Sequence, residues 1–140
     1  MNVQPYLFFE GRCVEAIEFY KKALGAKVEA ILRWKDGPPG ACPPGADPEL
    51  VMHSAFRIGD TTVMAADGMK AGTPKFEGFS LTVAVDDDAQ AAKRFAALSE
   101  GGQVQQPLGK SFFASSFGMV KDRFGVSWMV IAGAQKQGGK

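Results

Sequence analysis

The feature that most constrains the fold is an order of strands and helices that occurs twice. Alternating apolar residues predict strands, and apolar residues three and four apart predict helices. These patterns predict strand 3–9, helix 13–24 and strands 26–34, 50–58 and 61–66, then strand 78–85, a helix ending near residue 99, and strands 103–107, 112–120 and 125–131. Each half therefore contains a strand, a helix and three more strands, which predicts an α+β fold of two βαβββ modules.

A shift of 76 residues aligns the two halves. It places Phe19 on Phe95 and Gly25 on Gly101. It also places the first-strand residues Gln4, Tyr6 and Phe8 on Ser80, Thr82 and Ala84. The final hairpins match at a different shift, because only the first half contains the proline-rich segment 36–48, which we expect to be an exposed loop.

The helices have recognisable ends and apolar stripes. Gly25 is expected to end the first helix, and Asp86 is expected to cap the second. The apolar spacing gives one stripe of Val14, Ile17, Tyr20, Lys21 and Leu24 in the first helix, and one of Ala89, Ala92, Phe95 and Ala96 in the second. The run Lys21-Lys22 is interpreted as a solvated helix face. The boundaries are module one at 1–68, a linker at 69–76, module two at 77–132 and a frayed tail at 133–140, all within one domain.

Composition excludes several classes of function. With 46% apolar and 22% charged residues, the chain is predicted to be globular. Its formal charge of +1 offers no bulk attraction to nucleic acid or to an anionic membrane. The chain has a single histidine, His53, so one chain cannot form a metal site with several histidine ligands. A catalytic triad based on histidine could form only around His53.

The cysteines and the amino terminus indicate the compartment. Residues 1–5 lack the features of a signal peptide, and no apolar run reaches the ~18 residues of a spanning helix. We therefore expect a soluble cytoplasmic protein. In that compartment Cys13 and Cys42 are not expected to form a disulfide. Cys13 is interpreted as a small buried apolar residue, although a helix start can lower a thiol pKa, and Cys42 as an exposed loop residue.

Four segments give the chain a family resemblance. They are Pro5-Tyr6-Leu7-Phe8-Phe9, Glu15-Ala16-Ile17-Glu18-Phe19-Tyr20, Met52-His53 and Asp122-Arg123-Phe124-Gly125-Val126-Ser127-Trp128. With the duplicated modules, they resemble the vicinal oxygen chelate superfamily of glyoxalases, dioxygenases and bleomycin-resistance proteins, and its PhnB-like branch in particular. Some names for that branch include a demethylubiquinone methyltransferase. We do not expect methyl transfer, because the sequence lacks the glycine-rich strand-to-helix turn of such enzymes.

The resemblance implies a half-open, eight-stranded barrel with a ligand cleft. Catalytic members of the superfamily hold a divalent metal there, with two ligands from each module. Carried onto this chain, the ligand positions are Gln4, Met64, Ser80 and Met129. Amide, hydroxyl and thioether groups are poor ligands for the hard or borderline metals of this chemistry. We therefore expect no metal and no cofactor.

Several residues are candidates for the ligand site, and each also has a structural interpretation. His53 could contact an anionic ligand or act as an acid or base, or it could be a hydrogen-bonded structural residue. Tyr6 and Phe8 could form an aromatic wall or fill the barrel. Trp34 could contact a ligand as part of a lid or pack at an edge, whereas Trp128 is expected in the core. A strand containing Phe112, Phe113, Ser115 and Ser116 could cross the mouth of the cleft.

These expectations favour a small-molecule-binding protein or a metal-independent enzyme of unknown substrate, acting as a homodimer. Two alternatives stay open. One is a metal-dependent lyase or dioxygenase with unorthodox ligands. The other is sequestration of a drug without catalysis, for which a chain of charge +1 lacks the acidic character that a cationic drug requires.

Overall fold

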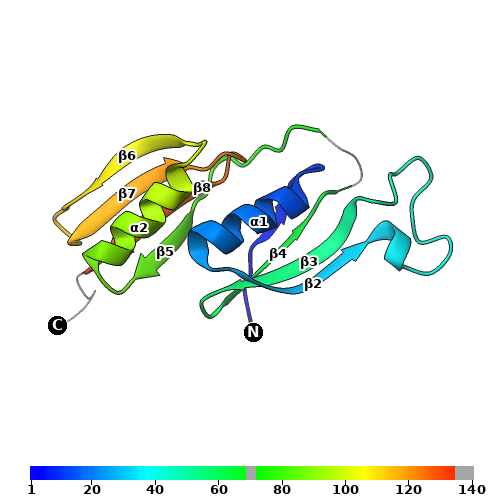
Figure 1. Ribbon diagram of the computed structural model, residues 1–140, viewed down its shortest axis with the longest axis horizontal. Coiled ribbons are helices and arrows are strands. Elements are labelled where there is room, and N and C mark those ends of the chain that lie inside the picture. The colour runs from blue at the N-terminus through cyan, green and yellow to red at the C-terminus, as the bar shows by residue number, and fades with distance from the viewer. Residues whose placement is uncertain (69–71, 135–140) are drawn as a thin grey trace. The chain divides into compact units, whose positions relative to one another are not determined.

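The computed structural model describes residues 1–68 and 72–134 and contains two compact units, which meet in the sequence between Pro74 and Lys75 (Figure 1). Each unit contains one four-stranded sheet. No helix in the described ranges is long and apolar enough to cross a membrane.

The first unit contains a strand, a helix, a second strand, a short 3-10 helix and two more strands. Their bounds are β1 (Tyr6–Phe8), α1 (Cys13–Leu24), β2 (Lys27–Arg33), η1 (Trp34–Asp36), β3 (Val51–Ile58) and β4 (Thr61–Ala66). The sheet order is β1-β4-β3-β2. β1 pairs with β4 in parallel, and the other neighbouring strands are antiparallel.

The second unit has the same topology. Its elements are β5 (Leu81–Val85), α2 (Asp88–Ser99), β6 (Gln103–Gly109), β7 (Ser116–Lys121) and β8 (Ser127–Ala132). The sheet order is β5-β8-β7-β6, again with the first and last strands parallel. The predicted α+β fold of two βαβββ modules is therefore confirmed.

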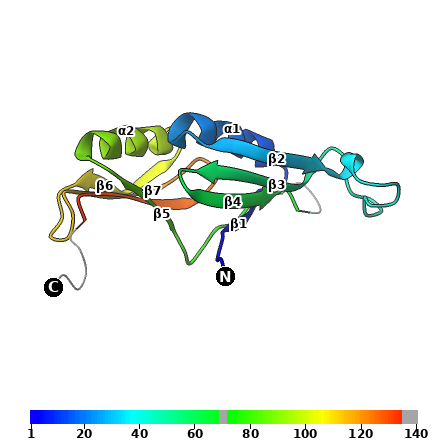
Figure 2. The same ribbon diagram turned by 90° about the horizontal axis from the view of Figure 1, so that it is seen from below.

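In the first unit, α1 covers one face of the sheet (Figure 2). The buried helix residues are Cys13, Ala16, Ile17, Tyr20, Ala23 and Leu24. The Tyr20 ring stacks on Phe56 of β3 with 6.0 Å between ring centroids. Val14, on the predicted stripe, is only half-buried, whereas Lys21 and Lys22 are exposed, which confirms their interpretation as a solvated helix face. Lys21 follows Tyr20 by one residue, about 100° around the helix, and so points away from the sheet.

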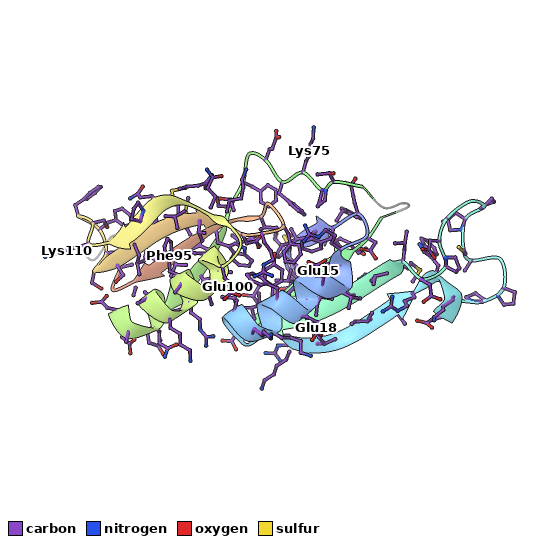
Figure 3. The ribbon with its side chains drawn as sticks, turned by 45° about the horizontal axis from the view of Figure 1, so that its top comes forward. Glu15, Glu18, Lys75, Phe95, Glu100 and Lys110 are labelled. Atoms are coloured by element: carbon purple, nitrogen blue, oxygen red, sulfur yellow. The ribbon has the colours of Figure 1, made fainter. Side chains whose placement is uncertain are left out.

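The second helix buries a different stripe from the predicted one. Ala91, Phe95 and Leu98 are buried, whereas three of the predicted residues, Ala89, Ala92 and Ala96, are exposed. Alanines lie on every side of this helix, so residue type alone does not distinguish its faces. Phe95 lies between α2 and the sheet (Figure 3).

The start of α2 also differs from the prediction. Asp87, not Asp86, is the capping residue, and its carboxylate accepts a hydrogen bond of 2.8 Å from the backbone N–H of Gln90. Three consecutive aspartates offered equivalent caps, and the backbone conformation selects the middle one. α1 ends as predicted at Gly25, which has a left-handed conformation with φ of 68°.

Several strands begin or end at residues other than those predicted. β1 and β5 are shorter than expected at their amino ends, and Trp34 begins η1 instead of ending β2. Phe112 and Phe113 lie in the β6–β7 loop, where Ser111 N–H donates to the Ala114 carbonyl. β6 extends through Pro107, which is tolerated because β6 is an edge strand.

Candidate functional site

The candidate site lies on the face of the first sheet opposite α1. Side chains alternate between the two faces of a strand. In β3, Ser54 and Phe56 are buried on the helix side, which places His53 and Ala55 on the other, open face. Tyr6 and Ala55 both pair with Met64, so these three residues form a row across the open face. Leu32 pairs with His53 at the neighbouring position.

Tyr6, Phe8 and His53 form an aromatic cluster on this face. The Tyr6 Oη lies 2.9 Å from His53 Nδ1, within hydrogen-bond distance, and the two ring centroids are 5.6 Å apart. The Phe8 ring stacks on Tyr6 with 5.0 Å between centroids and 29° between planes. Tyr6 is 37% exposed and Phe8 54% exposed, so these rings form an accessible apolar surface with a polar pair beside it.

The Tyr6 phenol can be the hydrogen-bond donor of this cluster. Partial burial raises the pKa of Tyr6 above its ordinary value, and the nearby Cys13 thiol adds to the effect. Tyr6 therefore carries its proton at neutral pH and can donate it in a hydrogen bond. The histidine ring nitrogen that faces Tyr6 can accept that bond.

The four positions at which the superfamily places metal ligands are divided between the two units. Gln4 and Met64 lie in the first unit, and Ser80 and Met129 lie in the second. Met64 lies directly across from Tyr6, and Met129 lies across from Thr82 in the equivalent parallel pair. Gln4 precedes β1 and is exposed. Ser80 precedes β5, and its hydroxyl is 2.7 Å from the hydroxyl of Ser127. The structure therefore brings Tyr6, Phe8, His53 and Met64 together on one face.

These donors do not fit a catalytic divalent metal. The two methionines supply soft thioethers, and the Ser80 hydroxyl is already hydrogen-bonded to another hydroxyl. Within residues 1–68 and 72–134, no three side chains among His, Cys, Asp and Glu are grouped so that they could hold a metal ion.

Asp67 has a structural role that the sequence analysis did not identify. It is 3% exposed. One carboxylate oxygen accepts hydrogen bonds from the N–H groups of Gly11 at 2.9 Å and Cys13 at 2.8 Å, and the other accepts from Val51 N–H at 2.8 Å. Its position directly after an apolar strand was the only sequence signal for this role. Asp67 ties the β1–α1 turn to the start of β3.

Asp122 has a comparable role in the second unit. It is 3% exposed and accepts hydrogen bonds from the N–H groups of Phe124 and Val126 and from Trp128 Nε1, at 2.9, 3.0 and 2.8 Å. Trp128 is 3% exposed, so its predicted place in the core is confirmed. One buried carboxylate therefore holds the turn between β7 and β8 and the start of β8.

The two cysteines and Trp34 lie outside the strands of the first sheet. Both thiols are free. Cys13 is fully buried, and desolvation is the main cause that raises its pKa to about 12, so its interpretation as a small apolar residue is confirmed. Cys42 is half-buried, not exposed as expected. Trp34 is also half-buried, and its Nε1 has no hydrogen-bond partner among the described residues.

The two βαβββ modules are the fold of the glyoxalase-like superfamily. A structure of a glyoxylase/bleomycin resistance protein/dioxygenase domain from Frankia sp. EAN1pec shares the fold, with a TM-score of 0.62, 14% identity and 94% of each chain covered.

The particular family is indicated by a model described as 3-demethylubiquinone-9 3-methyltransferase, which matches residues 1–131. The chain belongs to this family, the PhnB-like branch of the superfamily.

Three further proteins resemble the chain along most of its length. Protein YjdN of Escherichia coli K12 is 31% identical over 138 residues, which cover 93% of this chain and 94% of that protein. The structure of protein PA1353 from Pseudomonas aeruginosa has a TM-score of 0.82 at 41% identity, covering 94% of this chain and 97% of that one. The PhnB protein from Bacillus cereus has a TM-score of 0.78 at 25% identity, covering 94% and 99%.

Proposed function

We propose that the chain binds a small organic molecule on the open face of the first sheet, without a metal ion, as a binding protein or as a metal-independent enzyme. The observation that carries this proposal is the hydrogen-bonded pair of Tyr6 and His53 beside the exposed ring of Phe8. Small-molecule sites combine apolar and aromatic walls with a few polar groups that orient the ligand, and this cluster has both parts.

The same geometry assigns roles to the candidate residues. Phe8 and Tyr6 would form the apolar wall, and Met64 would contribute an adaptable contact beside Tyr6. His53 would be the polar contact and, if the chain is an enzyme, its acid or base. Gln4, which precedes β1 in the same unit, would be a further polar contact, whereas Ser80 and Met129 belong to the second unit and are not part of this proposal.

The metal-dependent alternative lacks support from the donors. A catalytic zinc site uses about three protein ligands drawn from His, Cys, Asp and Glu, and the inherited positions supply none. Asp67, a carboxylate near a strand end, already accepts hydrogen bonds on both oxygens. We therefore propose that the protein works without a resident metal or cofactor.

The family description names a methyl transfer, which we do not propose for this chain. The turn between β1 and α1 would be the place for a cofactor bound at a helix start. Asp67 accepts hydrogen bonds from the Gly11 and Cys13 N–H groups of that turn, so these donors already bind a carboxylate of the chain itself and not the phosphate or carboxylate of a cofactor.

A cytoplasmic location is part of the proposal. The free thiols of the two cysteines are consistent with a reducing compartment.

A thermal-shift screen of metabolites, divalent metals and S-adenosylmethionine tests the function. A ligand that binds only the folded protein stabilises it by about 2.7 kcal/mol at a hundred times its Kd, which raises Tm by several degrees. We expect an organic metabolite to produce such a shift, and the metals and S-adenosylmethionine to produce none.

Two variants connect that shift to the site. Replacing Tyr6 and Phe8 together by alanine should abolish it, whereas Phe112→Ala, which removes a 90% exposed ring from the second unit, should leave it unchanged. Elemental analysis should find well under one metal ion per chain after dialysis against a mild chelator. About one zinc, nickel, manganese or iron ion per chain, lost in Gln4→Ala or His53→Ala, would contradict the proposal.

A further inference from the structure

We propose that Tyr6 fixes the tautomer of His53 so that Nε2 carries the proton, and that the site therefore takes an anionic ligand with a planar aromatic body. This inference rests on the proposed function and specifies the class of ligand. It follows from the direction of one hydrogen bond and from the charges on the open face.

The direction of the Tyr6–His53 bond follows from the acidity of its two groups. A neutral imidazole has one nitrogen that donates and one that accepts. A phenol O–H is more acidic than the N–H of neutral imidazole, and an imidazole nitrogen is the stronger base. The stable arrangement is thus Tyr6 O–H donating to His53 Nδ1 across the observed 2.9 Å.

The other ring nitrogen of His53 is then a donor without a partner inside the described structure. With Nδ1 accepting from Tyr6, the proton of the neutral ring is on Nε2. The structure gives His53 no second hydrogen bond within residues 1–68 and 72–134. His53 is only half-buried, beside the exposed Tyr6 ring, and its Nε2–H is the group that we propose donates to an oxygen of a bound molecule.

The charges on this face favour an anion. Arg57 follows His53 by four residues on the same strand and therefore lies on the same face. Its cross-strand partner is Lys27, so two cationic side chains lie at one end of this face. The loose contact of Arg57 with Asp60, at 3.9 Å, compensates only part of this charge.

The apolar part of the cluster favours a planar ligand body. Tyr6 and Phe8 are stacked and accessible, and aromatic rings pack well in offset-stacked or edge-to-face arrangements. Leu32, the cross-strand partner of His53, is 43% exposed and extends the apolar surface on the other side of the ring. A carboxylate attached to an aromatic ring has the shape and charge for both parts.

Nitrogen-15 NMR of the full, untagged chain tests the inference. Because His53 is the single histidine, its two ring nitrogens give an unambiguous pattern. At about pH 9, where an ordinary imidazole is neutral, we expect the Nε2–H pattern in the wild type. In Tyr6→Phe, which retains the ring and loses only the hydroxyl, the two nitrogen shifts should move toward each other.

Benzoate and benzylamine are the ligand probes, because they share a ring and differ in charge. Benzoate should shift the His53 signals saturably, with affinity about fivefold weaker in Tyr6→Phe, and benzylamine should not. Phe8→Leu is the matched control variant, which should weaken benzoate binding and leave the tautomer unchanged.

The outcomes separate this inference from the proposed function. An Nδ1–H pattern in the wild type, or an unchanged pattern in Tyr6→Phe, overturns the role of Tyr6 and leaves the proposed function standing. An Nε2–H pattern that benzylamine perturbs and benzoate does not overturns the ligand class. If neither probe binds, the ligand class is also overturned, and the thermal-shift screen decides independently whether the face binds another small molecule.

Discussion

At the scale of single residues, Asp67 connects three backbone N–H groups from two parts of the first unit. Its carboxylate accepts three backbone hydrogen bonds while almost fully buried. In Asp67→Asn, one side of the amide would present N–H groups to backbone N–H donors, and at least one buried donor would lose its partner. We expect the free energy of unfolding to fall by roughly 2–3 kcal/mol, measured by urea denaturation.

Asp60→Asn is the matched control, because Asp60 is fully exposed and its contact with Arg57 is 3.9 Å long. This change should leave the urea midpoint unchanged within error. If Asp67→Asn were as stable as the wild type, the three hydrogen bonds would not stabilise the unit as described.

At the scale of secondary-structure elements, the close packing of α2, β6 and β7 depends on Gly118. A Cβ at this position would lie 2.7 Å from Cε1 of Phe95 and 2.9 Å from the Leu108 Cα. Gly118→Ala should therefore destabilise the protein by about 1–3 kcal/mol, measured by thermal or urea denaturation. The ring could move, but the backbone of β6 could not move without disturbing its pairing with β7.

Gly109→Ala is the control within β6, because nothing lies within 4 Å of a Cβ built there. It should have little effect. Adding Phe95→Leu to Gly118→Ala should restore part of the lost stability, because it removes the ring that the new methyl group meets. A stable Gly118→Ala single variant would show that α2 packs more loosely against the sheet than the distances indicate.

At the scale of the whole molecule, each four-stranded sheet has two edge strands, which are β1 and β2 in one unit and β5 and β6 in the other. Edge strands carry unpaired backbone groups that natural proteins cover or protect. β6 is exposed along nearly its whole length. We expect a homodimer that covers some of these edges, with a mass by light scattering of twice the 14.9 kDa chain. A single-chain mass at micromolar concentration would refute this.

Much of the architecture could be predicted from local patterns. Helix α1 was predicted with both of its ends, and β4 likewise, because apolar periodicity and a terminal glycine are local signals. The stripe of α2 was mostly wrong, because its alanines do not differ in polarity from face to face. Asp87 as the cap and the loop position of Phe112 depended on backbone conformation, which three adjacent aspartates and a run of aromatic residues did not specify.

For the candidate site too, some features follow from local sequence patterns and others from the pairing of distant strands. Local patterns in the chain predict the repeated βαβββ order and the alternation that places Tyr6 and Phe8 on one face, and the four positions taken from the family resemblance carry no imidazole, carboxylate or thiol. The hydrogen bond between Tyr6 and His53, which are 47 residues apart, and the contact of Asp67 with the start of α1 follow from the three-dimensional pairing of the strands. The physical reason is that period and composition act within a few residues, whereas the partner of a polar group depends on which strands pair and in what register.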